Sequence, residues 1–389
     1  MSVAAEPVVP EFMMAARLHA IGEPMRVDRI AVPEPRPTDV LVEVRACGIV
    51  PNLQRVIDNF FGTKTSDNKL YPPLPWIFGL DPAGVVASVG AQVTAVRPGE
   101  RVYVNPARGC GSCRMCRAGR TLYCPEFSFQ GYFARSRAIM LAYPYGGFAQ
   151  YITAPVTALV RLPDRVSYNE AARLGYLGTV YSAMKKIGVG PGNVLLINGI
   201  SGTLGLCAAL IGLAMGAKRV LGTGRNPALL ERVRALAPGR VFVHAMSGDV
   251  TAGVAGDPLS AFTAAMTDGM GVDGVIDCLP PGAPPQAMMR AIRTLRRGGK
   301  AVNVGAVAGN LPLDAFWMMT NQIGIEGSVW FTPAEGEEIV ALADAGFLNL
   351  SVFEHRVAPL SGVDDTLAQM RTNTDGGFAN YVIEPCRVA

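Results

Sequence analysis

The sequence predicts an α/β protein in which a doubly wound parallel sheet lies beside a second, barrel-like β domain. Two observations predict this: the texture of the chain changes near residue 165, and a glycine loop follows an apolar run at 194–198. The 389 residues are too many for one ordinary domain. They suit two domains, each able to bury its own core.

The first 160 residues or so alternate short β-rich runs with proline and glycine, which is typical of an all-β, barrel-like domain. From about residue 165, apolar strands alternate with segments of helical periodicity. This alternation predicts a doubly wound parallel sheet. Its strands are expected at 194–198, 219–223, 241–243, 274–278 and 301–305, with helices from 202, 227, 259 and 285.

The parallel-sheet domain is expected to be inserted between two pieces of the β domain. The run 325–330 is strand-like and apolar, a helix follows at about 333–345, and the run 379–385 returns to the first texture. We therefore expect a β domain at 1–165, the parallel-sheet domain at 166–330, and the remainder of the β domain at 331–389.

Composition excludes several classes of partner. The net charge is only +4, and the basic clusters lack interleaved aromatic residues, so we expect no nucleic-acid partner. Apolar runs stop far short of the roughly 20 residues that a membrane span needs, so we expect no membrane association. The first residues do not form a secretory signal. We expect a cytoplasmic protein.

Four of the eight cysteines lie in one short lobe at about 105–130, with the spacing C-x2-C-x2-C-x7-C. Four thiolates suit a closed tetrahedral zinc site with no open position for a substrate. The alternative is a lobe that has lost its metal or forms adventitious disulfides. We predict one structural zinc held by Cys110, Cys113, Cys116 and Cys124.

The glycine loop follows a predicted strand and opens a predicted helix, which is the context that a dinucleotide-binding loop requires. Glycines allow a tight turn and close approach of the backbone to a pyrophosphate. A purely structural turn is the alternative. Residues predicted to contact the cofactor are Gly199, Ser201, Gly202, Thr203, Leu204 and Gly205 in the loop, with Thr179 and Gly305 outside it.

The end of the second predicted strand indicates the choice of cofactor. An NAD site usually carries an acid there, whereas this chain reads Gly224, Arg225 and Asn226. Nothing there repels a 2′-phosphate, and Arg225 can pair with one. The sequence therefore favours NADP(H) over NAD(H). The alternative is a solvated arginine beside a pocket that accepts both cofactors.

These features together resemble the medium-chain dehydrogenase/reductase superfamily over nearly the whole chain. The resemblance includes the runs 98–102 and 146–151, the glycine loop and the cysteine lobe, and the lobe is similar to that of zinc alcohol dehydrogenases. It implies a GroES-like barrel joined to a Rossmann domain, and an NAD(P)-dependent oxidoreductase activity.

The chain departs from zinc-dependent members of that superfamily at all three catalytic-zinc positions. Val50, Leu80 and Tyr176 occupy them, and the three histidines of the chain lie elsewhere. Valine and leucine cannot coordinate zinc. We expect no catalytic zinc, the alternative being a shifted site that uses Cys47 and Asp81. The motifs around the active site resemble those of zinc-independent quinone and enoyl reductases.

Without a metal, hydride transfer to an activated C=C, C=O or C=N acceptor is the favoured reaction, because zinc normally stabilises the alkoxide of a simple alcohol. Tyr176 is the candidate proton donor, Asn52 the candidate partner of the acceptor oxygen, and Asp81 a candidate acid or base. The alternatives are a packing tyrosine, a turn asparagine and a salt-bridged aspartate.

An aromatic-rich stretch at 59–76, with Trp317 and Trp330, is expected to line a pocket for a small, apolar substrate. Two other functions stay open: alcohol or aldehyde dehydrogenation, and non-catalytic dinucleotide binding. The family commonly assembles through the edge of the nucleotide sheet. The apolar run 325–331 therefore predicts a homodimer or homotetramer.

Overall fold

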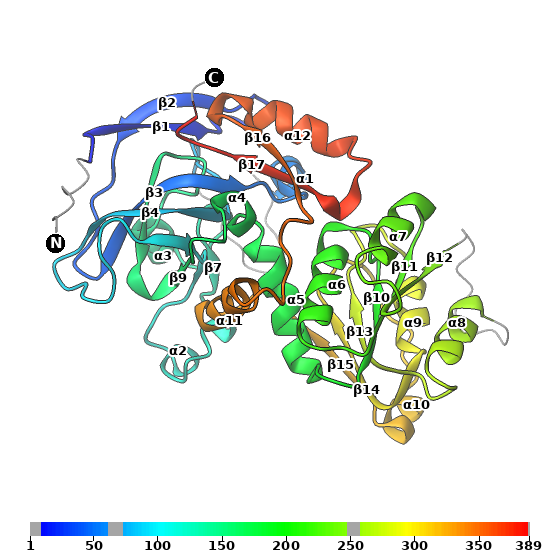
Figure 1. The fold of residues 1–389 in the computed structure, drawn as a ribbon. Coiled ribbons are helices and arrows are strands. Elements are labelled where there is room, and N and C mark those ends of the chain that lie inside the picture. Colours follow the sequence, from blue (N-terminus) through cyan, green and yellow to red (C-terminus); the bar gives the residue numbers. More distant parts are fainter. Residues whose placement is uncertain (1–8, 61–72, 247–256, 388–389) are drawn as a thin grey trace.

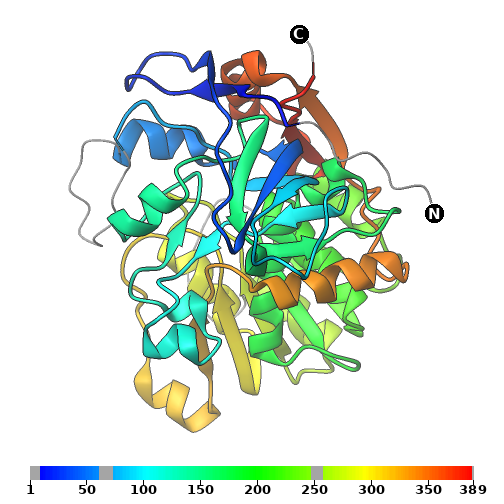
Figure 2. The ribbon, with the colours of Figure 1, turned by 90° about the vertical axis from the view of Figure 1, so that its left-hand side faces the viewer.

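The computed structural model describes residues 9–60, 73–246 and 257–387. Two bodies, each built on its own sheet, lie side by side (Figure 1). Figure 2, viewed from the side of the first body, shows its strands in front of the parallel sheet. The α/β prediction is confirmed.

The first body contains a seven-stranded sheet in the order β16-β17-β3-β4-β5-β9, with β8 also paired to β3. Its central pair, β3 and β4, is antiparallel and almost wholly buried, because apolar residues occupy both faces. The strands are β3 (Asp39–Gly48), β4 (Asp81–Val89), β5 (Arg101–Val104), β8 (Tyr151–Pro155), β9 (Leu159–Arg161), β16 (Glu354–Ala358) and β17 (Ala379–Ile383).

Smaller elements surround this sheet. Two two-stranded sheets, β1 with β2 and β6 with β7, lie beside it, and the second holds the base of the cysteine lobe. The elements are β1 (Phe12–Arg17), β2 (Arg26–Ala31), β6 (Ala107–Arg108), β7 (Ser128–Phe129), α1 (Leu53–Phe60), α2 (Arg114–Arg117), α3 (Arg137–Ala142), α4 (Tyr168–Ala171) and α12 (Val363–Arg371).

The second body is a six-stranded, fully parallel sheet in the order β12-β11-β10-β13-β14-β15. All five residues of β10 are buried, as expected of a parallel strand covered on both faces. The strands are β10 (Val194–Asn198), β11 (Arg219–Gly224), β12 (Val241–Ala245), β13 (Val272–Asp277), β14 (Leu295–Asn303) and β15 (Gly324–Gly327).

Five helices connect these strands: α6 (Thr203–Ala214), α7 (Pro227–Arg234), α8 (Pro258–Met266), α9 (Pro285–Ile292) and α10 (Ala315–Asn321). Three of them begin with a proline, which suits the first turn because it lacks an N–H to satisfy. Each predicted strand and helix start lies near an observed one, although β15 ends at Gly327 and the predicted strand ran to 330.

The chain leaves the first sheet after β9 and returns to it at β16, after α11 (Pro333–Asp344). β17 then pairs antiparallel with β3. This path is in keeping with an inserted parallel-sheet domain, while the limits 1–165, 166–330 and 331–389 stay a prediction. In the described part of the chain, no helix combines the length and apolar character that crossing a bilayer requires.

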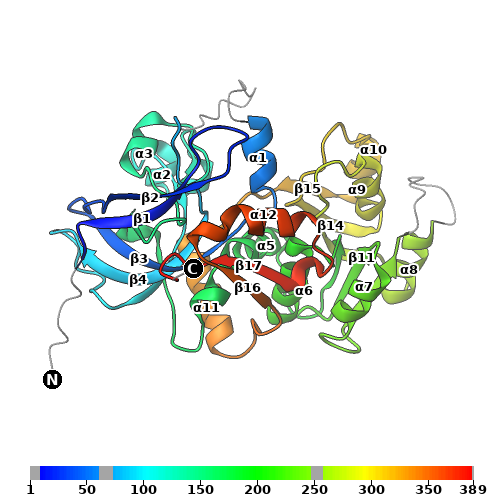
Figure 3. The ribbon, with the colours of Figure 1, turned by 90° about the horizontal axis from the view of Figure 1, so that it is seen from above.

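Helix α5 (Leu174–Ile187) lies between the two sheets (Figure 3). It packs against α6 on one side and α11 on the other. Its Gly178 is pressed against the Phe331 ring, which a Cβ atom at 178 would meet at 2.2 Å. This contact fixes α5 against the segment that follows β15.

Candidate functional site

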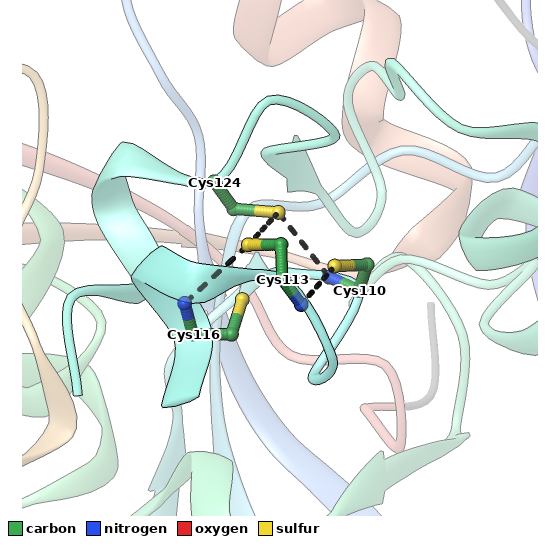
Figure 4. A group of neighbouring side chains, drawn as sticks. All are labelled: Cys110, Cys113, Cys116 and Cys124. Carbon is green, nitrogen blue, oxygen red and sulfur yellow. Dashed lines mark hydrogen bonds between the residues drawn. The ribbon is translucent and has the colours of Figure 1, made fainter. Parts of the chain in front are cut away.

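The cysteine lobe brings its four sulfur atoms together (Figure 4). The Sγ atoms of Cys110, Cys113, Cys116 and Cys124 all lie within 4.8 Å of one another. Three backbone N–H groups donate to these sulfurs: that of Cys110 to Cys124, that of Cys113 to Cys110, and that of Cys116 to Cys113. Such donors stabilise thiolates rather than thiols.

This arrangement fits a tetrahedral zinc ion. Zinc–sulfur bonds of about 2.3 Å imply sulfur–sulfur separations of roughly 3.8 Å, and Cys113 and Cys124 have their sulfurs 3.9 Å apart. All four cysteines are free, without disulfides. Because four protein ligands leave no open position, the lobe suits a structural zinc and cannot bind a substrate through it.

The glycine loop lies at the carboxyl end of β10, where it meets α6. Gly199 has a φ of +87°, which a side chain would strain. A Cβ atom on Gly205 would lie 2.1 Å from the Gly199 carbonyl oxygen. Gly202 begins α6 without a side-chain cap, so the first N–H groups of the helix have no side-chain partner there. These are the properties of an anion-binding loop.

The residues at the end of β11 and just after it have two different roles. Asn226 caps α7, since its Oδ1 accepts from the N–H groups of Ala228 and Leu229 at 3.0 and 3.2 Å. Arg225 is exposed, and no acidic partner for it is found among the described residues. Gly224 packs against Leu230. Arg225 is thus the group with a charge to offer an incoming phosphate.

Two predicted cofactor contacts lie outside the loop. The Thr179 hydroxyl is buried and donates to the Gly175 carbonyl at 2.7 Å, within α5. Gly305 follows β14, and a Cβ atom there would lie 2.5 Å from the Leu279 oxygen. Both positions lie at the carboxyl side of the parallel sheet, but their contacts here are internal to the protein.

The three positions that correspond to catalytic-zinc ligands converge at one end of the β3–β4 pair. Gly48 pairs with Asp81 in the register of these strands. Val50 lies two residues beyond Gly48 and Leu80 one residue before Asp81, and both are buried. Tyr176 follows Gly175, which contacts the Asp81 carboxyl. Two of the three positions are thus occupied by aliphatic side chains.

The alternative metal site, with Cys47 and Asp81, does not fit a metal. The Cys47 thiol is fully buried, and burial followed by the nearby Asp81 charge raises its pKa well above the usual range. In the part of the chain that the structure describes, the cysteine lobe is the only group of three or more potential metal ligands. Among the described residues, the region around Tyr176 therefore lacks the ligand set of a metal site.

The Asp81 carboxyl is buried, and one of its two oxygens accepts a hydrogen bond from a side chain. The Tyr103 hydroxyl donates to Oδ1 at 2.7 Å, whereas Oδ2 has no hydrogen-bond partner. Burial raises the pKa of Asp81 to about 7, although the Tyr103 hydrogen bond, the Arg173 charge and the Gly175 backbone each lower it. The carboxyl therefore titrates near neutrality, without access to solvent.

Tyr176 lies beside this carboxyl, at the start of α5. Burial, followed by the negative charge of Asp81, raises the pKa of its phenol well above the usual range. The phenol stays protonated at neutral pH and can act as a donor. Sequence reasoning missed Arg173, whose guanidinium lies 5.5 Å from the Tyr176 ring centroid and donates to the carbonyls of Gly377 and Ala379.

Asn52 has a partner that sequence reasoning also missed. The Tyr132 hydroxyl donates to the Asn52 Oδ1 at 3.1 Å. Tyr132 lies close enough to Tyr176 for its charged form to raise the pKa of that phenol. Nothing in the sequence around Tyr132 marks it, because the contact joins residues 80 positions apart. The four groups Asn52, Asp81, Tyr132 and Tyr176 thus form one neighbourhood.

The expected aromatic pocket wall is described only in part, because residues 61–72 lie outside the described residues. Of the two other tryptophans, Trp330 belongs to the core and Trp317 is partly buried. Trp330 is 8% exposed, packs on Phe129, and donates from Nε1 to Asn105. Trp317 packs beneath the Arg293 guanidinium. That they line a pocket stays a prediction.

Comparison with known proteins gives the family. Residues 36–164 match the family described as "Alcohol dehydrogenase GroES-like domain", and residues 203–345 match "Zinc-binding dehydrogenase". An alcohol dehydrogenase of Rhizobium meliloti is 30% identical, over 86% of this chain and 89% of its own length. The chain belongs to the medium-chain dehydrogenase/reductase superfamily.

Other relatives agree with this. A sorbitol dehydrogenase of Bacillus subtilis is 29% identical over 82% of each chain. A solved zinc-binding dehydrogenase of Sinorhizobium meliloti, bound to NADP, superposes with a TM-score of 0.78 at 23% identity, over 97% of this chain and 100% of its own. The present chain is therefore an NAD(P)-dependent oxidoreductase, with a GroES-like domain and a Rossmann-type domain.

We predict one zinc per chain, measured by elemental mass spectrometry. Cys116→Ser loses that zinc and lowers the midpoint of thermal unfolding by roughly 5 °C or more, because the lobe loses its cross-link. Cys386→Ser, which alters an exposed cysteine outside the lobe, is the control and keeps both values. Two zincs per chain would contradict a metal-free active site.

We also predict that Asp81 makes stability depend on pH. Its pKa in the folded protein is about 7 against 3.8 for the free group. The folded chain thus keeps a proton that the unfolded chain has lost, and stability falls as pH rises from about 4 to about 7. The fall is limited to about 1.4 kcal/mol per pH unit.

Urea unfolding at pH 5, 6, 7 and 8 measures this dependence. Asp81→Asn removes the titrating group, so its free energy of unfolding falls less steeply over this range than that of the wild type. Asp344→Asn, at an exposed position, keeps the wild-type slope. Equal slopes for wild type and Asp81→Asn would show that the carboxyl does not titrate in this range.

Proposed function

We propose that this enzyme transfers hydride between NADP(H) and an activated C=C, C=O or C=N acceptor, without a catalytic zinc. The observation that carries the proposal is the replacement of metal ligands by Val50 and Leu80, buried beside Tyr176. Simple alcohols need a Lewis acid to stabilise their alkoxide. Conjugated or otherwise polarised acceptors need only a positioned hydride and a hydrogen-bond or proton donor.

We assign Tyr176 as the proton or hydrogen-bond donor to the acceptor. Its raised pKa supports a donor rather than a base. In the low-dielectric surroundings of Val50 and Leu80, such a hydrogen bond is stronger than in water. The bound dinucleotide supplies the hydride, and the chain supplies the donor that neutralises the developing negative charge.

We assign Asn52 as the second contact to the acceptor oxygen. Its Oδ1 is engaged by Tyr132, which leaves the Nδ2 group to donate. A donor at this place suits a carbonyl or quinone oxygen. Asp81 is too deeply buried to reach a substrate directly, so we assign it as a positioning residue for Tyr176, through the backbone of Gly175.

The preference for NADP(H) rests on Arg225, which is exposed at the end of β11 where an acid would select NAD(H). The Sinorhizobium meliloti relative bound to NADP shows that the fold accepts this cofactor. We assign the cofactor contacts to Gly199, Ser201, Gly202, Thr203, Leu204, Gly205, Gly224, Arg225, Asn226, Thr179 and Gly305.

The alternative function is dehydrogenation of an alcohol or aldehyde, which the names of the alcohol and sorbitol dehydrogenase relatives favour. In either case we propose a small, apolar substrate. A homodimer or homotetramer would cover the free edge of β15 and the neighbouring exposed side chains Phe316, Met319 and Val329. A cytoplasmic location stays a prediction.

We predict that purified enzyme with NADPH reduces enones, quinones or imines with a higher kcat/KM than it oxidises simple alcohols with NADP+. Tyr176→Phe removes the proton donor and lowers kcat by about a hundredfold, with cofactor affinity unchanged. Steady-state kinetics on a panel of acceptors and alcohols, with NADP+ titration by fluorescence, measures both.

Tyr181→Phe is the matched control, because it also removes a hydroxyl from α5. That hydroxyl donates a hydrogen bond to Glu338. This variant keeps the wild-type kcat. Preference for alcohols, or full activity in Tyr176→Phe, would contradict the proposed reaction. Cofactor binding without turnover on any acceptor would favour the non-catalytic alternative.

We predict that Arg225→Ala weakens NADP+ binding by about ten- to a hundredfold, since a charged hydrogen bond is worth about 1.5–3 kcal/mol. NAD+ binding stays within about twofold, because NAD+ lacks the 2′-phosphate. Fluorescence titration with both cofactors measures this. Arg234→Ala, in the next helix, changes neither affinity; equal losses for both cofactors in Arg225→Ala would reject the assignment.

A further inference from the structure

A buried acid lies next to the strand that carries the glycine loop. Asp277 ends β13, and in the parallel register it pairs with Asn198, the last residue of β10. The side chain of Asp277 is fully buried. The Asn198 Nδ2 group donates to its Oδ1 at 2.7 Å and also reaches the Ala287 carbonyl at 3.3 Å. The glycine loop begins at the next residue, Gly199.

The hydrogen bonds continue from Asn198 into the loop. The Thr223 hydroxyl, at the end of β11, donates to the Asn198 Oδ1 at 2.7 Å. The Gly199 N–H donates in turn to the Thr223 Oγ1 at 3.1 Å. Every donor in this series of hydrogen bonds points toward the carboxyl of Asp277. Hydrogen bonds aligned in one direction polarise and strengthen one another.

Among the described residues, no cation pairs with this acid. Its Oδ2 is buried without a hydrogen-bond partner. Burial raises the pKa of Asp277 to about 6, while the Asn198 hydrogen bond and the Leu279 backbone lower it.

The groups around this carboxyl add no charge. Asn198 from β10, Asn303 from β14 and the Ala287 carbonyl from α9 are neutral. The titratable neighbours are the Cys278 thiol, whose pKa the Asp277 charge raises, and, beside Cys278, the Cys207 thiol of α6. Burial raises the pKa of both, so both are neutral near pH 7.

We propose that Asp277 is a positioning residue for the bound dinucleotide: through Asn198 and Thr223 it fixes the backbone at Gly199, and its charge opposes the anionic cofactor, so that binding takes up a proton at this carboxyl. The inference rests on the proposal that the glycine loop holds the dinucleotide. The proton comes from solvent and goes to the free Oδ2, while Oδ1 keeps the hydrogen bond from Asn198. The Oδ2–H bond is the only covalent bond formed in the protein, and none is broken.

The positioning role is tested at Thr223, which lies in the middle of this series of hydrogen bonds. Thr223→Val keeps the shape and removes the hydroxyl, so the Gly199 N–H loses its acceptor. We expect the affinities for NAD+ and NADP+ to fall together by about five- to tenfold. Thr223→Ser restores the hydroxyl and stays within about twofold of wild type. Circular dichroism and thermal unfolding check that both variants fold.

The charge part is tested with Asp277→Asn, which keeps an oxygen for Asn198 and removes the ionisation. The probe is NAD+, since it has no phosphate group that titrates near pH 6 and is stable in acid. Isothermal titration calorimetry from pH 6 to pH 8, in two buffers of different protonation enthalpy, gives the affinity and the protons taken up.

In the wild type, affinity for NAD+ rises severalfold as pH falls from 8 to 6, with net proton uptake on binding. The Asp277→Asn variant binds at least as tightly at pH 8 and shows a weaker pH dependence. The histidines are common to both proteins and cancel in this comparison.

Three results would overturn the inference. Equal affinities of Thr223→Val and Thr223→Ser would remove the positioning role. Equal proton uptake by wild type and Asp277→Asn would remove the charge role. Both leave the proposed function intact. Failure of the wild type to bind either NAD+ or NADP+ would instead reject the dinucleotide site itself, and this inference with it.

Discussion

The contact between the Asp81 carboxyl and the first turn of α5 fixes the arrangement of the candidate active site. Helix α5 begins at Arg173 without a side-chain cap of its own, and Asp81 on β4 lies where such a cap would act. A Cβ atom on Gly175 would lie 2.2 Å from the Asp81 Oδ1. Only glycine permits this approach, and Tyr176 takes its place from it.

The contact supplies geometry more than stability. Removing a carboxylate from water costs several kcal/mol, whereas a hydrogen bond to a charged group contributes only about 1.5–3 kcal/mol of stabilisation. The raised pKa of Asp81 is the measure of that deficit. The position of Tyr176 is therefore maintained by an electrostatically costly contact, and Tyr176 packs against the same apolar cluster as Val50 and Leu80.

Local patterns predicted most of the fold and the loops that carry the site. The buried strands of the parallel sheet are continuous apolar runs. The start of α7 was also visible, because Asn226 is its N-cap and Pro227 is the proline of its first turn. The apolar run at 325–330 predicted too long a strand, because Trp330 and Phe331 leave the sheet to bond with Asn105. Polar, exposed β16 gave no strand signal.

Contacts between distant residues could not be predicted in the same way. Tyr132 meets Asn52 across 80 residues, and Asp277 meets Asn198 across 79. Arg173 reaches carbonyls more than 200 residues away. No spacing rule connects such pairs, since only the strand order and register bring them together. The missing ligands at Val50 and Leu80 were visible because a substitution within a motif is a local signal.

Asp81 and Asp277 are buried without a full set of partners, which raises the question of what a carboxylate contributes where its charge is unfavourable. An ionised carboxylate accepts hydrogen bonds and donates none, so every neighbouring donor must point toward it. Tyr103 does so at Asp81, and Asn198 at Asp277. An amide in either place would leave that direction ambiguous, because it can both donate and accept. Each acid thus fixes the direction of the donor at its Oδ1, and a proton taken up at the free Oδ2 leaves that direction unchanged.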